Sequence, residues 1–288
     1  MEILKLLRAH QWLKNFFVFL PIFFGNQILN KESLLLTTLT FFAFSILSSS
    51  IYCLNDIMDV EMDRLHPEKK NRPIAKGTIS ISAAYTTMCV LLAISLTTLI
   101  FARLYAVLII AVIYYILNIL YCLRLKHIPL IDIFIVSSGF VLRILAGGSS
   151  SNIELSNWIV LMTFLISLFL ALAKRLDDTI YYKEKKIKLR KNISRYNAEF
   201  IQLSLAIIAS VTIVCYIMYT VDQNVIERIS NNYLYTTSIF VMLGILRFLQ
   251  LTIVDMKSSS PTKILIKDRF IQLCIFFWMA LFTIILYI

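Results

Sequence analysis

The chain has 288 residues, of which 59% are hydrophobic and 16% charged, and its mean hydropathy is +0.79. Soluble domains contain about 45–50% apolar residues, so this composition excludes an ordinary soluble protein and indicates an integral membrane protein. Lys and Arg number 28 against 17 Asp and Glu, a formal net charge of +11. This excess indicates anionic partners, and the apolar composition argues against nucleic acid as one of them.

Nine apolar segments are candidates for membrane-spanning helices, which need about 20 residues. In chain order they cover approximately residues 16–30, 34–54, 79–101, 104–123, 129–147, 155–173, 199–220, 233–250 and 270–288. Pro21 and Gly25 interrupt the first of them. The sequence therefore predicts an all-α polytopic membrane bundle of about nine transmembrane helices, forming a single domain over residues 1–288.

Basic residues are concentrated in the connections on one side of these segments. If the N-terminus is cytoplasmic, most Lys and Arg residues lie on the cytoplasmic side, and only Lys31, Arg103 and Arg228 lie in outer connections. Cytoplasmic loops of membrane proteins carry such an excess. We therefore expect a multi-pass protein of the cell (inner) membrane, with its N-terminus and active site cytoplasmic. The basic run from Lys183 to Lys191 is explained by orientation alone.

Acidic and amide side chains at helical spacing follow the second predicted span. Asn55, Asp59 and Asp63 are four residues apart and would share one helical face, with Asp56 beside them and Tyr52 one turn earlier. Carboxylates at this spacing repel one another and need a compensating cation. Mg²⁺ prefers a few carboxylates together with water and substrate phosphates. The spacing therefore predicts a magnesium site more readily than a simple acidic cap at the membrane surface.

Basic residues follow the acidic stripe on a loop that two prolines stiffen. They are Lys69, Lys70, Arg72 and Lys76. Singly, each is also suited to contact a lipid headgroup. Carboxylates that hold a metal beside Lys and Arg side chains suit a diphosphate leaving group, so the loop as a whole predicts a phosphate clamp.

The pattern Asn55-Asp56-x-x-Asp59-x-x-x-Asp63 resembles the first signature of the UbiA superfamily of intramembrane prenyltransferases. That resemblance implies nine helices around a central cavity, with a magnesium-diphosphate site on the cytoplasmic side. The string from His66 to Gly77, HPEKKNRPIAKG, is similar to one branch, the decaprenyl-phosphate phosphoribosyltransferases.

Further segments along nearly the whole chain resemble the same branch. They are Arg8 to Asn15, with Ala9 replacing the usual Pro; Leu125 to Asp132; Ser138 to Gly148; Ala173 to Arg175, with Asp178 where a Glu is usual; and Pro261 with Asp268 and Arg269. Several ordered matches are much more specific than the aspartate motif alone.

The segment after the sixth predicted span separates two reactions of the superfamily. Aromatic prenyltransferases typically have a second DxxxD pair there, whereas this chain has Tyr181 four residues after Asp177. Lys174 and Arg175 at the same place favour a substrate with an additional phosphate.

The resemblance implies an enzyme that transfers 5-phosphoribosyl from phosphoribosyl diphosphate to a polyprenyl phosphate such as decaprenyl phosphate. Diphosphate leaves on Mg²⁺, and the lipid-linked phosphoribose would serve cell-envelope glycan synthesis. The nucleophilic phosphate oxygen is already anionic and needs no general base. The implied residues are Asp56, Asp59 and Asp63 for catalysis; Asn55, Asp59 and Asp63 for the metal; and Lys14, Tyr52, Asn55, Lys69, Arg72, Lys126, Arg143, Lys174 and Arg175 for the substrates.

Some interpretations stay open at this point. Arg143 lies within a predicted span, where ionisable residues are usually functional, although it could also snorkel to the outer interface. An aromatic prenyltransferase with a prenyl diphosphate donor is the alternative enzyme, and a transporter or lipid-binding scaffold is the alternative outside enzymes. The polyprenyl length and the formation of homo-oligomers are not determined by the sequence.

Overall fold

The computed structural model describes residues 2–65, 69–185, 193–255 and 261–287, all of which are helical or in turns and loops. The chain divides into two compact units, Met1–Leu155 and Ser156–Ile288. His66, Pro67 and Glu68 of the loop motif lie outside the described residues. The two units are treated separately below.

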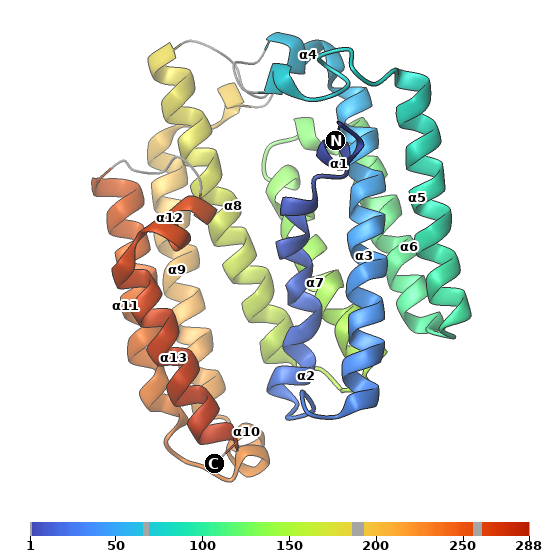
Figure 1. Ribbon diagram of the computed structural model, residues 1–288. Helices are drawn as coiled ribbons and strands as arrows, with labels where there is room; N and C mark the ends of the chain where they lie inside the picture. The colour runs from blue at the N-terminus through green and yellow to red at the C-terminus, as the bar shows by residue number, and fades with distance from the viewer. Residues whose placement is uncertain (1, 66–68, 186–192, 256–260, 288) are drawn as a thin grey trace. The chain divides into compact units, whose positions relative to one another are not determined.

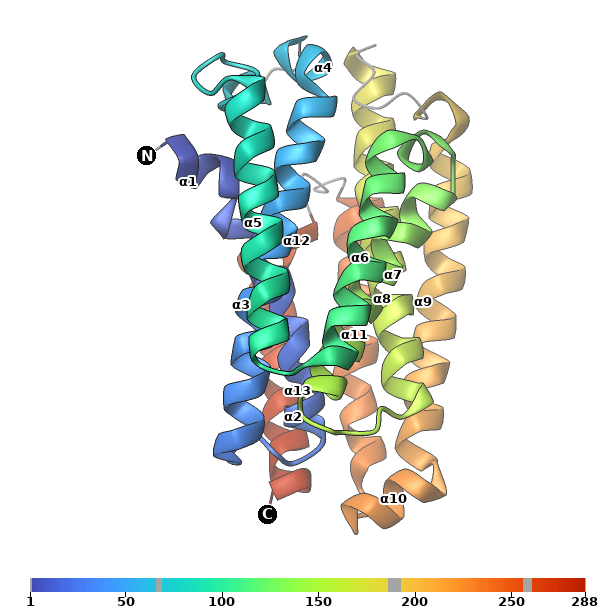
Figure 2. The same ribbon diagram turned by 90° about the vertical axis from the view of Figure 1, so that its right-hand side faces the viewer.

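The first unit is built on α3, its longest helix. Its elements are α1 (Glu2–Leu7), η1 (Ala9–Phe19), α2 (Leu20–Phe24), α3 (Lys31–Met58), α4 (Val60–Leu65), η2 (Lys69–Asn71), α5 (Ile81–Phe101), α6 (Tyr105–Leu123), η3 (Leu125–His127) and α7 (Ile131–Ser150). Helix α3 packs against α5, α6, α7 and η1 (Figure 1). A tight turn joins α5 to α6 at the end away from α4 (Figure 2). Because α3 packs against most of the other elements, this packing fixes the position of its two ends.

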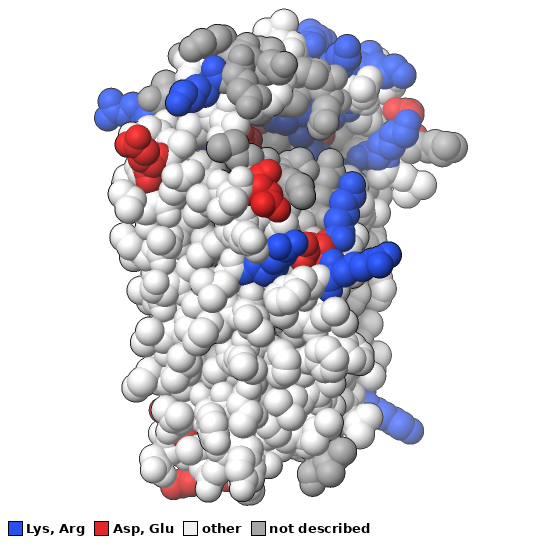
Figure 3. Space-filling view, turned by 90° about the vertical axis from the view of Figure 1, so that its left-hand side faces the viewer, with Lys and Arg blue, Asp and Glu red and all other residues white. Residues whose placement is uncertain are grey.

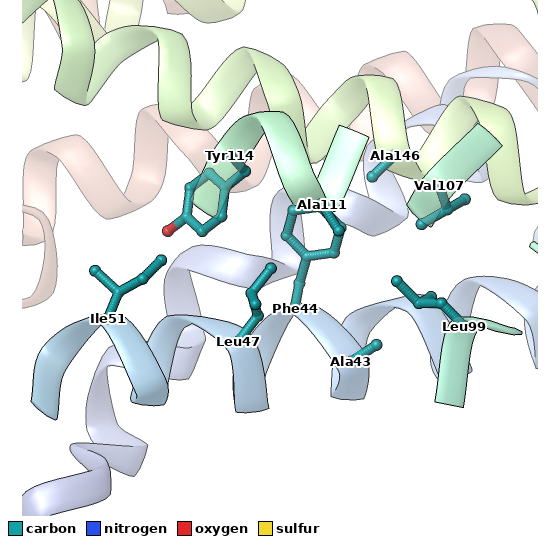
Figure 4. Packing of buried hydrophobic residues seen from close by; sticks show 9 residues of the cluster. All are labelled: Ala43, Phe44, Leu47, Ile51, Leu99, Val107, Ala111, Tyr114 and Ala146. Atoms are coloured by element: carbon teal, nitrogen blue, oxygen red, sulfur yellow. The ribbon is translucent and has the colours of Figure 1, made fainter. Parts of the chain in front are cut away.

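An apolar cluster joins α3 to α5, α6 and α7. Its members, all buried, are Ala43, Phe44, Leu47, Ile51, Leu99, Val107, Ala111, Tyr114 and Ala146. Figure 4 shows Phe44 reaching from α3 towards α6, and its ring centroid lies 5.6 Å from that of Tyr114. In a lipid environment, association of helices depends on such close packing because lipid tails are as apolar as the side chains.

Serine hydroxyls join α3 to its neighbours where the backbones come close. Ser50 donates to the carbonyl of Met88 on α5 at 2.9 Å, and Ser95 of α5 donates back to the carbonyl of Ala43 at 2.9 Å. Small polar residues are typical of contacts between membrane helices because they allow this approach and pair across it.

The first predicted span is a 3₁₀-helix followed by a short α-helix. Residues three apart on a 3₁₀-helix lie on one line. Along η1, Trp12 donates to the Ser49 hydroxyl at 3.0 Å, Asn15 donates to Ser45 at 3.0 Å, and Val18 is fully buried. The candidate span 16–30, which the sequence marked as interrupted, is therefore not a regular α-helix, because a period of three residues, and not 3.6, matches the polar partners on α3.

The second unit contains α8 (Asn157–Lys185), η4 (Ile193–Arg195), α9 (Ala198–Val221), α10 (Gln223–Ile229), η5 (Leu234–Thr237), α11 (Ser238–Leu249), the π-helix η6 (Gln250–Val254), α12 (Pro261–Lys267) and α13 (Arg269–Tyr287). Helix α9 packs against α8 and α11, and α11 packs against α13. The Tyr216 hydroxyl lies 2.7 Å from the Thr237 hydroxyl and accepts the indole N–H of Trp278 at 2.6 Å. This buried hydroxyl thereby ties α9, η5 and α13 together.

Eight helical segments of the described chain are long and apolar enough to cross a membrane. They are Lys31–Met58, Ile81–Phe101, Tyr105–Leu123, Ile131–Ser150, Asn157–Lys183, Ala198–Val221, Leu234–Val254 and Arg269–Leu286. They confirm the last eight predicted segments, and the chain is a multi-pass membrane protein. The face in Figure 3 has a broad band with hardly any Lys, Arg, Asp or Glu, as expected of a surface covered by lipid.

One glycine controls how closely η1 approaches α7. A Cβ atom on Gly147 would lie 2.0 Å from the carbonyl oxygen of Val18, which is backbone and cannot move alone. Gly147→Ala should therefore displace η1 and destabilise the protein by about 2 kcal/mol, in the range typical of overpacking. Thermal unfolding in detergent measures this loss as a lowered Tm.

Gly244→Ala on α11 is the matched control, because the nearest atom to its added Cβ is 3.7 Å away. Its Tm should equal or exceed that of the wild type, since Ala is the better helix former. Equal Tm values for the two variants would contradict the close packing of η1 on α7.

Candidate active site

The acidic stripe lies where α3 passes into α4. Helix α3 ends at Met58, and Asp59 is its C-cap with φ −101° and ψ 6°. The backbone hydrogen bonds from Asp59 N to Asn55 O (3.0 Å) and from Asp63 N to Asp59 O (2.8 Å) still continue the four-residue spacing across the break. The predicted single helix is thus kinked at its middle carboxylate.

The polar side chains of the stripe have two sets of partners, one for Asp56 and Asp63 and another for Asn55 and Asp59. Asp56 and Asp63 are both buried and both accept from Arg72, whose Nη1 lies 3.1 Å from Asp56 Oδ1 and 2.5 Å from Asp63 Oδ2. Asp56 Oδ1 also pairs with the guanidinium of Arg8. Residues seven apart share a helical face, so Arg72 bridges two carboxylates that lie two turns apart.

Asn55 and Asp59 face a different element, the end of α6 and the start of η3. The Cys122 thiol lies 3.7 Å from Asn55 Oδ1, and Lys126 Nζ lies 2.6 Å from Asp59 Oδ1. Cys122 and Lys126 are four residues apart, as Asn55 and Asp59 are. Residues one helical turn apart on one segment thus contact residues one turn apart on the other. The sequence predicted Lys126 as a substrate-binding residue; the structure places it beside Asp59, and its contact with substrate stays a prediction.

The loop that carries Arg72 is anchored by an apolar side chain. Ile74 is buried in a cluster with Leu6, Cys53, Ile57 and Ala84. The backbone turns at Gly77, whose φ of +79° is readily adopted only by glycine. The loop therefore folds back towards the end of α3, where Arg72 contacts Asp56.

Arg8 is a site residue that the sequence analysis did not identify. It lies between α1 and η1, and its guanidinium carbon is 5.1 Å from the centroid of the Tyr52 ring. Burial lowers the pKa of Arg8 from its ordinary value, and the Asp56 carboxylate offsets part of this effect. The segment Arg8 to Asn15 carried a family resemblance, but no spacing in it pointed to Asp56, which lies 48 residues away.

His10, two residues after Arg8, lies near the positive charges of Arg8 and Lys14. Burial, followed by the charges of Arg8 and Lys14, lowers the pKa of His10 from its ordinary value, so His10 is mainly neutral at pH 7. Lys14 is exposed on η1, and Lys69 is half-buried at the start of η2. Both lie in the first unit with the carboxylates.

Arg143 lies deeper in the first unit, in the middle of α7. It donates to Asn15 Oδ1 (2.6 Å), to the Gly139 carbonyl (2.7 Å) and to the Tyr114 hydroxyl (2.8 Å), and it is buried. These contacts hold η1, α6 and α7 together. Arg143 does not snorkel to an interface, and its predicted contact with substrate stays a prediction.

The remaining predicted residues belong to the second unit. Helix α8 continues past the predicted end of its span at residue 173, so Lys174 and Arg175 lie on a helix. Lys174 is exposed, whereas Arg175 is buried and lies 3.2 Å from Asp178 Oδ2. Their assignment to substrate phosphates stays a prediction.

The acidic residues suit a metal in their chemistry. Asp56, Asp59, Asp63 and Asn55 offer only oxygen donors, which hard ions prefer. Asp56 Oδ2 is buried and has no hydrogen-bond partner among the described residues. The described residues contain no group of three or more His, Cys, Asp and Glu side chains already arranged around an ion, because the carboxylates turn towards Arg8, Arg72 and Lys126.

Comparisons with known proteins agree with this fold. A profile described as the UbiA prenyltransferase family matches residues 16–273. A protein of Corynebacterium glutamicum named decaprenyl-phosphate phosphoribosyltransferase is 31% identical over 99% of this chain and 86% of its own length. A protein of the same name from Mycolicibacterium smegmatis is 30% identical over 96% of this chain and 90% of its own length.

A solved structure has the same fold. It is that of a UbiA homologue from Archaeoglobus fulgidus bound to DMAPP and Mg²⁺, and it superimposes with a TM-score of 0.73 and 21% identity over the full length of both chains.

The bridge between Asp56 and Asp63 is testable by removing one charge. Asp63→Asn weakens a charge-assisted hydrogen bond to Arg72, and such bonds contribute about 1.5–3 kcal/mol. The loop over residues 69–80 should then open more often, and its amide hydrogens should exchange about tenfold faster. Hydrogen exchange followed by mass spectrometry measures this change.

Glu61→Gln provides the control on the same short helix. Glu61 pairs with Arg64 at the surface, where ion pairs contribute little, so exchange in the loop should stay within twofold of wild type. If both variants left the exchange unchanged, the loop would not be held by Arg72.

Proposed function

The chain belongs to the UbiA prenyltransferase family of membrane transferases, and from this premise we propose that it transfers 5-phosphoribosyl from phosphoribosyl diphosphate to a polyprenyl phosphate. The observation that carries the proposal is the matched set of carboxylates and cations at the end of α3. Two relatives that cover nearly the whole chain bear the corresponding name. The product would be a lipid-linked phosphoribose for cell-envelope glycan synthesis.

Magnesium is the cofactor that the proposal requires. Asn55, Asp56, Asp59 and Asp63 would hold it, and Asp56 Oδ2 is an acceptor that is already buried and unpaired within the described chain. When bound, Mg²⁺ would neutralise charge on the departing diphosphate. Arg72 and Lys126 would contact diphosphate oxygens, together with Lys14, Lys69 and Tyr52 of the same unit.

The reaction joins a lipid-phosphate oxygen to ribose C1 while the bond from C1 to the diphosphate oxygen breaks. The positive charge that develops on the ribose is that of an oxocarbenium-like transition state. The nucleophile is an anion, so no group has to remove a proton from it. The protein's contribution is to orient two anionic substrates and to stabilise the leaving diphosphate.

A second phosphate on the donor needs its own cations. Lys174 and Arg175 on α8 supply two positive charges, and Asp177 is followed at the fourth position by Tyr181 instead of a second carboxylate. Two cations without a second pair of carboxylates favour the binding of a ribose phosphate or lipid phosphate here over the binding of a second metal. We propose a single catalytic domain over residues 1–288, with its N-terminus and active site on the cytoplasmic side of the cell membrane.

The reaction is tested with purified protein, a polyprenyl phosphate, Mg²⁺ and labelled phosphoribosyl diphosphate. A labelled lipid should form, and Asp59→Asn should reduce its rate at least 100-fold because the variant removes a carboxylate of the proposed metal and diphosphate site. Glu61→Gln, a charge loss at the surface of the neighbouring helix, should change the rate less than twofold. Transfer from a prenyl diphosphate to an aromatic acceptor, without lipid-linked ribose phosphate, would show the alternative enzyme.

Lys174 separates a phosphorylated sugar donor from a prenyl donor. Lys174→Gln should raise KM for phosphoribosyl diphosphate about tenfold, with a smaller change in kcat, because it removes one charge from the proposed 5-phosphate site. Lys183→Gln is the control, since it removes an exposed charge from the same helix. Equal KM values for the two variants would assign the ribose phosphate to other residues.

A further inference from the structure

The carboxylates and cations at the end of α3 balance one another in number. Asp56, Asp59 and Asp63 carry three negative charges, and within the described residues Arg8, Arg72 and Lys126 form ion pairs with them. A divalent cation bound at the unpaired Asp56 Oδ2 would add positive charge to this set, repel the nearby cations and favour the displacement of one of them. The displaced side chain would then need another anion.

Among these three cations, Arg8 can leave its carboxylate at the smallest cost. Arg72 bridges Asp56 and Asp63, and Lys126 is the cation that contacts Asp59 within the described residues. Asp56 Oδ1 accepts from both Arg8 and Arg72, so departure of Arg8 still leaves this buried carboxylate paired. Departure of Arg72 would instead break two ion pairs.

The backbone of Arg8 has an uncommon conformation, in which its side chain contacts Asp56. Its φ and ψ are 49° and 49°, the left-handed region that costs a non-glycine residue about 1–2 kcal/mol. Such residues persist where the surrounding structure fixes them, often at functional sites. Here the next residues are fixed by η1, which is tied to α3 through Trp12 and Asn15. The guanidinium of Arg8 also lies over the Tyr52 ring.

We propose that Arg8 is a further substrate-binding residue that exchanges partners: it neutralises Asp56 in the unliganded site and transfers to diphosphate oxygens when the metal and diphosphate bind. The inference rests on the proposed function only in placing a metal and a diphosphate at this site. It does not depend on phosphoribosyl as the transferred group.

Partner exchange makes the binding of the metal and the diphosphate interdependent. A metal alone would compete with Arg8 for Asp56 and would bind weakly. A diphosphate accepts the released guanidinium, so each ligand strengthens the binding of the other by the same factor. Guanidinium suits this exchange because its planar fork matches carboxylate and phosphate oxygens alike.

The experiment measures Mn²⁺ binding by electron paramagnetic resonance, with and without inorganic pyrophosphate, on the full-length protein in detergent. In the wild type, pyrophosphate should increase Mn²⁺ affinity at least tenfold beyond its effect in protein-free solution. In Arg8→Gln, Mn²⁺ alone should bind at least threefold more tightly, and the effect of pyrophosphate should fall at least threefold. Arg64→Gln, which removes an exposed arginine of α4, should match the wild type.

A second variant tests the exchange from the other side and keeps the Arg8 side chain. Asp56→Asn removes the charge that holds Arg8, so pyrophosphate without metal should bind at least threefold more tightly than to the wild type. Loss of the Asp56 charge alone also favours an anion, so the contribution of Arg8 is the part of this gain that is lost in the double variant Arg8→Gln, Asp56→Asn. Arg8→Lys, which keeps the charge, should retain most of the coupling.

The proposal is overturned if pyrophosphate does not strengthen Mn²⁺ binding in the wild type, or if Arg8→Gln leaves the coupling within threefold. It is also overturned if Asp56→Asn fails to strengthen metal-free binding of pyrophosphate. Because these measurements use no ribose donor and no lipid, they distinguish failure of this inference from failure of the proposed transfer reaction.

Discussion

Three buried or half-buried carboxylates at the end of a membrane-spanning helix require positive partners, and much of the first unit is arranged to provide them. The end of α3 and the short helix α4 that follows it present Asp56, Asp59 and Asp63 within two turns. Their cations come from three separate segments, namely the junction of α1 and η1, the loop after α4, and η3. Charge matching therefore brings together parts of the chain that are distant in sequence, and the unpaired oxygen of Asp56 lies among them.

The long apolar helices could be predicted because about 20 consecutive apolar residues have few other uses. The acidic stripe could also be predicted, because Asn55, Asp59 and Asp63 repeat at helical spacing. The kink at Asp59 could not be predicted, because neither glycine nor proline marks it, and the partners of the carboxylates beside it, Arg72 and Lys126, come from other segments. Arg8 was missed for a related reason: its partner is far along the chain and its backbone conformation has no sequence signal.

In the proposed reaction, the cations at this site have two successive roles. They first allow the carboxylates to be buried in a folded protein, and they then offer positive charge to phosphates. The two uses are compatible because carboxylate and phosphate oxygens accept the same donors in similar geometry.

The 3₁₀ form of η1 fixes the distance between two ends of the first unit. With a rise of about 2.0 Å per residue, its 11 residues extend ~22 Å, whereas an α-helix of the same length would extend ~16 Å. The Val18 contact with Gly147 anchors one end, and Arg8 begins at the other. If this segment formed an α-helix, Arg8 would lie about 6 Å closer to Val18. The 3₁₀ form of η1 therefore determines how far Arg8 lies from the contact with Gly147.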